Sequence, residues 1–140
     1  QGQTVRFNSE KETFDWAKDF AKSLKPGDMV AMFGNLGAGK TVISRGICAG
    51  LGFQGSVCSP TYTILHEYPN EPPIFHFDLY RLEGGADLNE VGLDPDYLAQ
   101  GISLIEWPER LDDTSSVTHV IRIEIISETE REINLEEKTA

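Results

Sequence analysis

The chain has 140 residues, of which 39% are hydrophobic and 25% are charged, a composition typical of one domain with its own core. Its net charge of −11 has the wrong sign for holding a nucleic-acid backbone, so we expect any nucleic acid to be bound by a partner. Because no apolar run approaches the roughly 20 residues of a membrane span and the first residues do not resemble a signal peptide, we expect a soluble, cytoplasmic protein, with residues 1–140 forming a single domain whose tail frays from about 136.

The first predicted elements are a short strand and an amphipathic helix. Residues 4–7 alternate between polar and apolar side chains, as in a strand. Ser9 lies three residues before Glu12, the spacing of a capping box, and apolar residues then recur at helical intervals. The sequence therefore predicts a helix over 10–24, ended by the KPGD turn.

A buried strand, a glycine-rich loop and a second helix follow. The continuous apolar run at 29–33 predicts the strand, and apolar residues one turn apart predict a helix that reaches about residue 51. Residues 81–101 are expected to form a loop with one or two helical turns. The fold predicted is α/β: one P-loop NTPase-like domain with a mostly parallel central sheet, flanking helices and antiparallel additions. Its further strands are expected at 62–67, 74–80, 102–106, 118–125 and near 131–135.

The loop sequence GNLGAGKT matches the Walker A pattern. Glycines let successive N–H groups turn toward phosphate oxygens, and the following helix adds its positive N-terminal end. Lys40 is expected to bridge the β- and γ-phosphates, and the hydroxyl of Thr41 to bind Mg²⁺. The loop residues predicted to bind the nucleotide are Gly34, Asn35, Leu36, Gly37, Ala38, Gly39, Lys40, Thr41 and Val42.

Two carboxylates complete the predicted site. Glu106 ends the apolar strand in ISLIEWPER, where a Walker B acid projects toward the phosphate loop. We predict that it is a metal ligand, against the alternative of an acid that only marks the exposed end of the strand. In IFHFDLYR the period of two places His76 and Asp78 on one face and the apolar residues Phe75, Phe77 and Leu79 on the other. We predict that Asp78 positions Mg²⁺ or the attacking water and that His76 braces it, against the alternatives of a solvated strand face and a structural histidine. Lys40, Asp78 and Glu106 are thus the predicted catalytic residues.

Two further residues are assigned to the nucleotide site. Thr61 follows a rigid proline in CSPTYTI and is predicted to sense the γ-phosphate as a switch, with an ordinary turn as the alternative. Trp107 directly follows Glu106, and the sequence leaves open whether it lines the nucleotide pocket or packs in the core.

Two classes of P-loop protein fit poorly. The N-K-x-D motif of GTPases does not occur, and the six arginines are too scattered for the arginine-rich lid of a small-molecule kinase, with Arg81 alone close to a site strand. The chain also leaves little length for a second substrate domain. These features favour a small ATPase whose turnover serves a partner.

The motifs GNLGAGKT, SPTYTI, HFDLYRL, EVGLD and IEWPERL occur together in the order seen in the bacterial TsaE family, which this chain resembles over about residues 5–111. The resemblance implies a P-loop α/β fold that binds ATP with Mg²⁺. It also implies association with TsaD and TsaB, the proteins that transfer a threonylcarbamoyl group to adenosine 37 of tRNAs reading codons that begin with A. The tRNA would then be contacted only through these partners.

The resemblance assigns roles to individual residues. Lys40 and Thr41 match the family's phosphate and metal positions, and Glu106 matches its metal-linked acid. Asp78 matches a strand carboxylate implicated in hydrolysis, Thr61 a switch-like threonine and Trp107 the tryptophan beside the acid. Asn35 departs from the family, in which an acidic residue is more usual, and beyond about residue 112 the match fades.

Two other functions remain open from the sequence alone. One is a phosphotransferase acting on a small alcohol. The other is a nucleotide-gated interaction module in which ATP only orders residues 59–63. We expect the surface that faces a partner protein to be formed by the loop at 82–98 and this switch-like segment.

Overall fold

The computed structural model describes residues 2–35, 38–55, 57, 65–79, 95–110 and 116–138. Within these residues, seven strands form one mixed sheet in the order β1-β7-β6-β2-β5-β4-β3. The strands are β1 (Gly2–Phe7), β2 (Met29–Phe33), β3 (Leu65–Tyr68), β4 (Ile74–Asp78), β5 (Ile102–Glu106), β6 (His119–Ile125) and β7 (Arg131–Glu137). The helices are α1 (Glu10–Phe20), α2 (Lys40–Gly50) and α3 (Pro95–Leu98), with 3-10 turns at Ala21–Ser23 and Pro108–Arg110.

The centre of the sheet is parallel and its two sides are antiparallel. Strand β2 runs parallel to β5 and to β6, and β5 runs parallel to β4. Strands β7 and β1 extend the sheet on one side and β3 on the other, all by antiparallel pairing. The α/β fold with antiparallel additions is therefore confirmed. Because the carboxyl ends of parallel strands meet at one edge, β2, β4 and β5 deliver their last residues to the same place.

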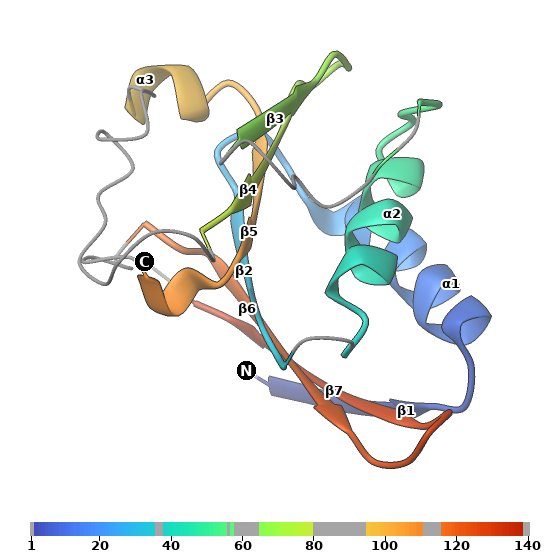
Figure 1. Ribbon diagram of the computed structural model, residues 1–140. Helices are drawn as coiled ribbons and strands as arrows, with labels where there is room; N and C mark the ends of the chain where they lie inside the picture. The colour runs from blue at the N-terminus through green and yellow to red at the C-terminus, as the bar shows by residue number, and fades with distance from the viewer. Residues whose placement is uncertain are drawn as a thin grey trace.

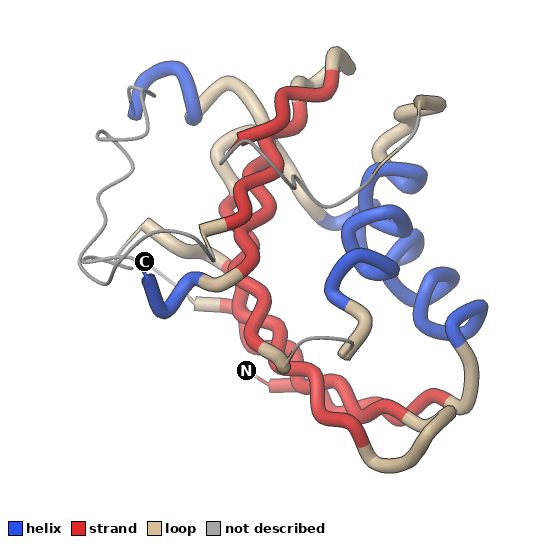
Figure 2. Tube along the Cα trace, viewed as in Figure 1, coloured by secondary structure: helices blue, strands red, loops and turns tan. Residues whose placement is uncertain are grey.

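Helices cover both faces of the sheet, but unequally (Figure 1). α1 and α2 pack against each other on one face, where Phe20 and Ile47 join a large apolar cluster. α3 lies on the opposite face, and Leu98 from this helix joins a second cluster that contains Phe75 and Phe77. The tube trace shows the same separation of helices and sheet (Figure 2). The apolar face predicted for the strand at 74–80 is thus confirmed.

Most predicted boundaries hold to within a few residues. The predicted helix over 10–24 is α1 followed by the 3-10 turn, and the Ser9 side chain accepts a hydrogen bond from the Glu12 amide at 3.2 Å, as the capping box requires. The predicted strand at 74–80 ends at Asp78 in the structure. The strand predicted at 62–67 corresponds to β3, and its residues 62–64 lie outside the described part. In the described part of 81–101, α3 is one helical turn.

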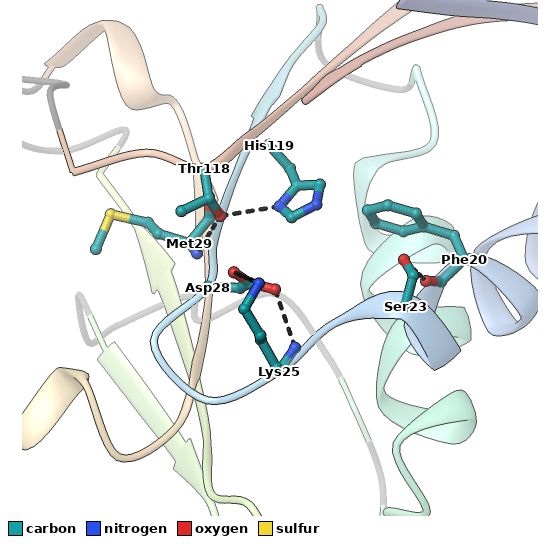
Figure 3. Close-up of polar contacts among 7 residues, drawn as sticks. All are labelled: Phe20, Ser23, Lys25, Asp28, Met29, Thr118 and His119. Atoms are coloured by element: carbon teal, nitrogen blue, oxygen red, sulfur yellow. Dashed lines mark hydrogen bonds and ion pairs between the residues drawn. The ribbon is translucent and has the colours of Figure 1, made fainter. Parts of the chain in front are cut away.

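The amino ends of β2 and β6 are joined by a local polar network (Figure 3). The Asp28 carboxylate accepts a hydrogen bond from the backbone N–H of Lys25 at 2.9 Å, which closes the turn before β2. The Thr118 hydroxyl accepts one from the N–H of Met29 at 2.9 Å and lies 2.9 Å from Nδ1 of His119. These contacts tie the turn to the start of β6.

None of the described helices is both long and apolar enough to cross a membrane.

Candidate phosphate-binding site

The loop between β2 and α2 has the backbone that its glycines predict. Gly39 has φ of 113°, in the left-handed region that side chains other than glycine rarely adopt. A Cβ added at Gly34 would lie 3.2 Å from both the Ala38 Cβ and the carbonyl oxygen of Ile123, so the loop packs closely here. The predicted order of strand, loop and helix is confirmed, with Leu36 and Gly37 outside the described residues.

The described part of the loop turns directly into the start of α2. The Ala38 N–H bonds the carbonyl of Asn35 at 3.0 Å, which makes a tight turn before α2, and the first residue of the helix is Lys40. The N–H groups of the first helical turn have no partner within a helix, and the helix dipole makes this end positive. Thr41 and Val42 lie in this first turn of α2, and their predicted binding of the nucleotide stays a prediction.

Lys40 is a buried cation. The residue is only 6% exposed, and its ammonium lies 3.8 Å from the centroid of the Trp107 ring. Burial lowers the pKa of Lys40 below its ordinary value, whereas the negative charges of Glu106, Glu109 and Asp78 act in the opposite direction. Among the residues that the structure describes, no hydrogen bond or ion pair involves this ammonium. Within the described residues, the site therefore holds a positive charge without a contacting anion.

Trp107 contacts Lys40 and also packs against the core, and its predicted place in the nucleotide pocket stays a prediction. Its ring faces the Lys40 ammonium in a cation–π contact and also packs, half-buried, against the cluster that contains Phe77. Trp107 is also the non-glycine residue with positive φ, 61°, in the described part of the chain. Residues held in this region are often found at functional sites, because the surrounding structure must hold them there.

Glu106 is held by a histidine from the neighbouring strand. Asp78 and Glu106 are directly opposite each other in the pairing of β4 with β5. Nε2 of His76 lies 2.6 Å from Oε2 of Glu106, and its Nδ1 lies 3.0 Å from the Tyr68 hydroxyl. The predicted role of His76 in bracing Asp78 is therefore wrong. Both ring nitrogens are engaged elsewhere. The Glu106 side chain on the adjacent strand is long enough to reach back to Nε2, and the Tyr68 hydroxyl contacts Nδ1.

The hydrogen-bonded row Tyr68, His76 and Glu106 crosses three strands inside the core. His76 is fully buried and Glu106 is 3% exposed, so the carboxylate has little freedom to rotate. The Tyr68 ring packs in turn against Phe53, with ring centroids 5.0 Å apart. Such outer partners commonly orient a carboxylate that binds a metal ion or a reacting group. Glu106 is thus an oriented acid and not a surface residue at the end of a strand.

The residues present fit a nucleotide polyphosphate with Mg²⁺. Within the described residues no group of three or more His, Cys, Asp or Glu could hold a metal without help. Mg²⁺ bound with a nucleotide needs only one or two protein oxygens, because phosphates and waters fill the other positions. The Thr41 hydroxyl and the Glu106 carboxylate have this chemistry, and the loop glycines and Lys40 suit the phosphates.

Some predicted residues cannot be compared with the structure. Thr61, Arg81 and most of the loop at 82–98 lie outside the described residues, so their predicted roles stay predictions.

The sequence analysis missed Arg131, which reaches the phosphate loop from the far end of the chain. Its Nε donates a hydrogen bond to the carbonyl oxygen of Ala38 at 3.1 Å. A small cleft between the starts of α1 and α2 is lined by Arg131 together with Ser9, Gly39 and Val42. A strand was predicted near 131–135, but only the order of strands in the sheet brings it to the loop.

Comparison with known proteins gives consistent matches. A family model described as Threonylcarbamoyl adenosine biosynthesis protein TsaE matches residues 7–134. A crystal structure of Bacillus subtilis YdiB has a TM-score of 0.75 and 32% sequence identity to this chain, over 96% of this chain and 84% of that one.

Curated relatives carry the name tRNA threonylcarbamoyladenosine biosynthesis protein TsaE. The relative from Bacillus subtilis is 40% identical over 104 residues, which cover 74% of this chain and 65% of its own length. The relative from Treponema pallidum is 32% identical over 128 residues, 91% of this chain and 95% of its own. The relative from Streptomyces coelicolor is 44% identical over 93 residues, 64% of this chain and 62% of its own. The match thus spans less than two thirds of the Bacillus and Streptomyces relatives and nearly all of the Treponema one.

Proposed function

Because the chain belongs to the TsaE family of threonylcarbamoyl adenosine biosynthesis proteins, we propose that it binds ATP with Mg²⁺ and hydrolyses ATP in the service of tRNA modification. The observation that carries this proposal is the buried Lys40 ammonium at the mouth of a glycine-rich loop. Removing a cation from water is costly unless an anion compensates. A bound polyphosphate would supply that anion.

The loop and the start of α2 would bind the phosphates. The N–H groups of residues 39–42 would face the phosphate oxygens, and Lys40 would neutralise the charge on the β- and γ-phosphates. Thr41 would contribute its hydroxyl to Mg²⁺. When bound, this ion neutralises the charge that develops on the phosphate oxygens. Trp107 would shield the lysine from water on the side opposite the phosphates.

Two carboxylates would serve the hydrolysis step. Glu106 would be the metal-linked acid, oriented by His76, and Asp78 would orient the attacking water from the adjacent strand. We keep Thr61 as the residue that would sense the γ-phosphate.

We further propose that hydrolysis is coupled to TsaD and TsaB in the cytoplasm. The net charge of −11 supports an arrangement in which these partners, and not this chain, hold the tRNA. On this basis the chain hydrolyses ATP slowly alone and faster within the complex.

ATP turnover by the pure protein, with and without equimolar TsaD and TsaB, tests the proposal. A Glu106→Ala variant is the blank, because it keeps the phosphate loop and loses the proposed metal-linked acid. We expect turnover to rise with the partners and to fall to background in the variant. Turnover that ignores the partners would contradict the coupling, and turnover that survives in the variant would contradict the role of Glu106.

A further inference from the structure

Arg131 connects two segments that are far apart in the sequence. It is the first residue of β7, and its guanidinium is half-buried between the hairpin that joins β6 to β7 and the phosphate loop. On one side, Nε donates to the carbonyl oxygen of Ala38, 93 residues away. On the other side, Nη1 donates to the carbonyl oxygens of Ser127 at 2.8 Å and Glu130 at 3.0 Å. The side chain thus joins the tip of the hairpin to the loop.

The bond to Ala38 fixes more than one oxygen. The carbonyl of Ala38 and the N–H of Gly39 belong to the same planar peptide unit, in which the two groups point in opposite directions. When Arg131 holds the carbonyl toward the hairpin, the Gly39 N–H must point away from the hairpin. This N–H is one of the loop donors next to Lys40.

The orientation of this peptide unit needs an external constraint. Glycine adopts positive and negative φ about equally well, so Gly39, at φ of 113°, does not itself select one orientation of the preceding peptide. The neighbouring bonds, from the Ala38 N–H to Asn35 and from the Ile43 N–H to the Gly39 carbonyl, involve other peptide units. In the described part of the chain, the constraint on the Ala38 carbonyl comes from Arg131.

We propose that Arg131 is a positioning residue that sets the Ala38–Gly39 peptide so that the Gly39 N–H faces the phosphates of a nucleoside di- or triphosphate. The proposal rests on the nucleotide-binding function proposed above and adds the C-terminal hairpin to the site. An arginine suits this task because its planar fork donates in two directions at once, whereas a lysine ammonium lacks that geometry. Arg131 acts on the phosphates through the loop backbone.

Calorimetric binding of ADP without metal tests the proposal in four variants. Arg131→Gln removes the charge, and Arg131→Lys keeps the charge without the fork. Ser127→Ala is the matched control for the hairpin, because the Ser127 hydroxyl bonds the amide and carboxylate of Glu130 and leaves the Ala38 bond untouched. Arg6→Gln is the matched control for charge. Arg6 on β1 pairs with Glu132, the neighbour of Arg131 on β7, and this ion pair does not involve the loop.

We expect Arg131→Gln to weaken ADP binding about tenfold, the effect of losing one charge-assisted hydrogen bond. Arg131→Lys should lie between this variant and the wild type, and both control variants should bind like the wild type. Wild-type affinity in Arg131→Gln would overturn the proposal. An equal loss in Ser127→Ala would also overturn it, because hairpin integrity would then account for the effect.

Amide hydrogen exchange in the nucleotide-free protein separates this inference from the proposed function. We expect faster exchange at residues 38–40 in Arg131→Gln than in the wild type and in Ser127→Ala. If the wild type binds no ADP while the exchange still differs, the proposed function fails and the positioning of the loop stands. Unchanged exchange at these residues would overturn the positioning role itself.

Discussion

A lysine, a carboxylate and a histidine lie at each end of the central strands, and the two ends use them differently. At the amino end, Lys25 is exposed and its ammonium lies 3.6 Å from the buried carboxylate of Asp28. At the carboxyl end, Lys40 is buried against Trp107, and the buried carboxylate of Glu106 is paired with His76. The first lysine contacts an acid of its own chain, whereas the second contacts an aromatic ring.

The difference shows how the same groups serve structure or binding. At the amino end, the Asp28 carboxylate and the Thr118 hydroxyl accept hydrogen bonds from backbone N–H groups of the turn and of β2 (Figure 3). These polar groups therefore stabilise the fold itself. At the carboxyl end, the Glu106 carboxylate is hydrogen-bonded to His76, and within the described residues Glu106 forms no ion pair with Lys40. On the proposed function, the acid would serve the metal ion and the cation would serve the phosphates.

The largest expected effect is on nucleotide binding when Lys40 is removed. Lys40→Ala should weaken ATP binding at least about a hundredfold, since a buried charge-assisted contact with the phosphates is lost. The matched change at the other end, Lys25→Ala, should leave binding unchanged. Calorimetry on both variants measures this contrast, and equal affinities would remove the basis for the site.

Lys40→Ala should also leave the free energy of unfolding unchanged or raise it slightly. Burial lowers the pKa of Lys40, which means that the folded protein disfavours this charge when no nucleotide is bound. Chemical denaturation without nucleotide measures the effect. A loss of several kcal/mol would show that Lys40 mainly stabilises the fold.

The next effect is on hydrolysis when His76 is changed. His76→Phe should lower ATP turnover about ten- to hundredfold, because Glu106 loses the partner that orients it, while ADP binding without metal stays within about threefold. Tyr68→Phe, which removes the outer hydrogen bond and keeps the ring packing, should cause a smaller loss of the same kind. The dependence of turnover on Mg²⁺ concentration is the decisive measurement. A histidine with a purely structural role would change the thermal midpoint and leave that dependence as it is.

A moderate loss of stability is expected when Asp28, the acid at the amino end, is removed. Asp28→Ala should cost about 1 to 2 kcal/mol of unfolding free energy, because the Lys25 N–H loses its buried acceptor. The exposed acid of the Lys11–Asp15 pair is the control, and Asp15→Ala should cost about 0.5 kcal/mol or less. Urea denaturation compares the two variants. ADP affinity that falls in Asp28→Ala would mean that the two ends are coupled.

Local sequence signals predicted most of the fold and the phosphate loop. The loop residues are contiguous, so spacing alone identified them, and the apolar runs at 29–33 and 102–106 identified the strands that flank the site. Glu106 was found because it directly ends such a run. These features depend on neighbours in the chain, which a single sequence displays.

The contacts that the sequence did not predict depend on register and strand order. His76 bonds Glu106 and not Asp78 because β4 and β5 pair in a particular register, and no local pattern specifies which acid the ring will meet. Arg131 reaches Ala38 because β7 lies beside β6, which lies beside β2. The positive φ of Trp107 is likewise a result of tertiary packing.

The smallest expected effect is a pH dependence of stability at His119. Burial lowers the pKa of His119 below its ordinary value of about 6.5, with Lys25 acting in the same direction and Asp28 and Glu137 against it. Between the lowered pKa and about 6.5 the unfolded chain binds more protons than the folded one, so stability falls as the pH drops through this window. His119→Gln should lose this slope, a change of about 1 kcal/mol or less between pH 7 and pH 5. Parallel urea titrations of wild type and variant measure it, and a slope that persists would place the titrating group elsewhere. ADP affinity should respond to pH equally in both proteins, because His119 lies at the amino end of the central strands and the phosphate loop lies at their carboxyl end.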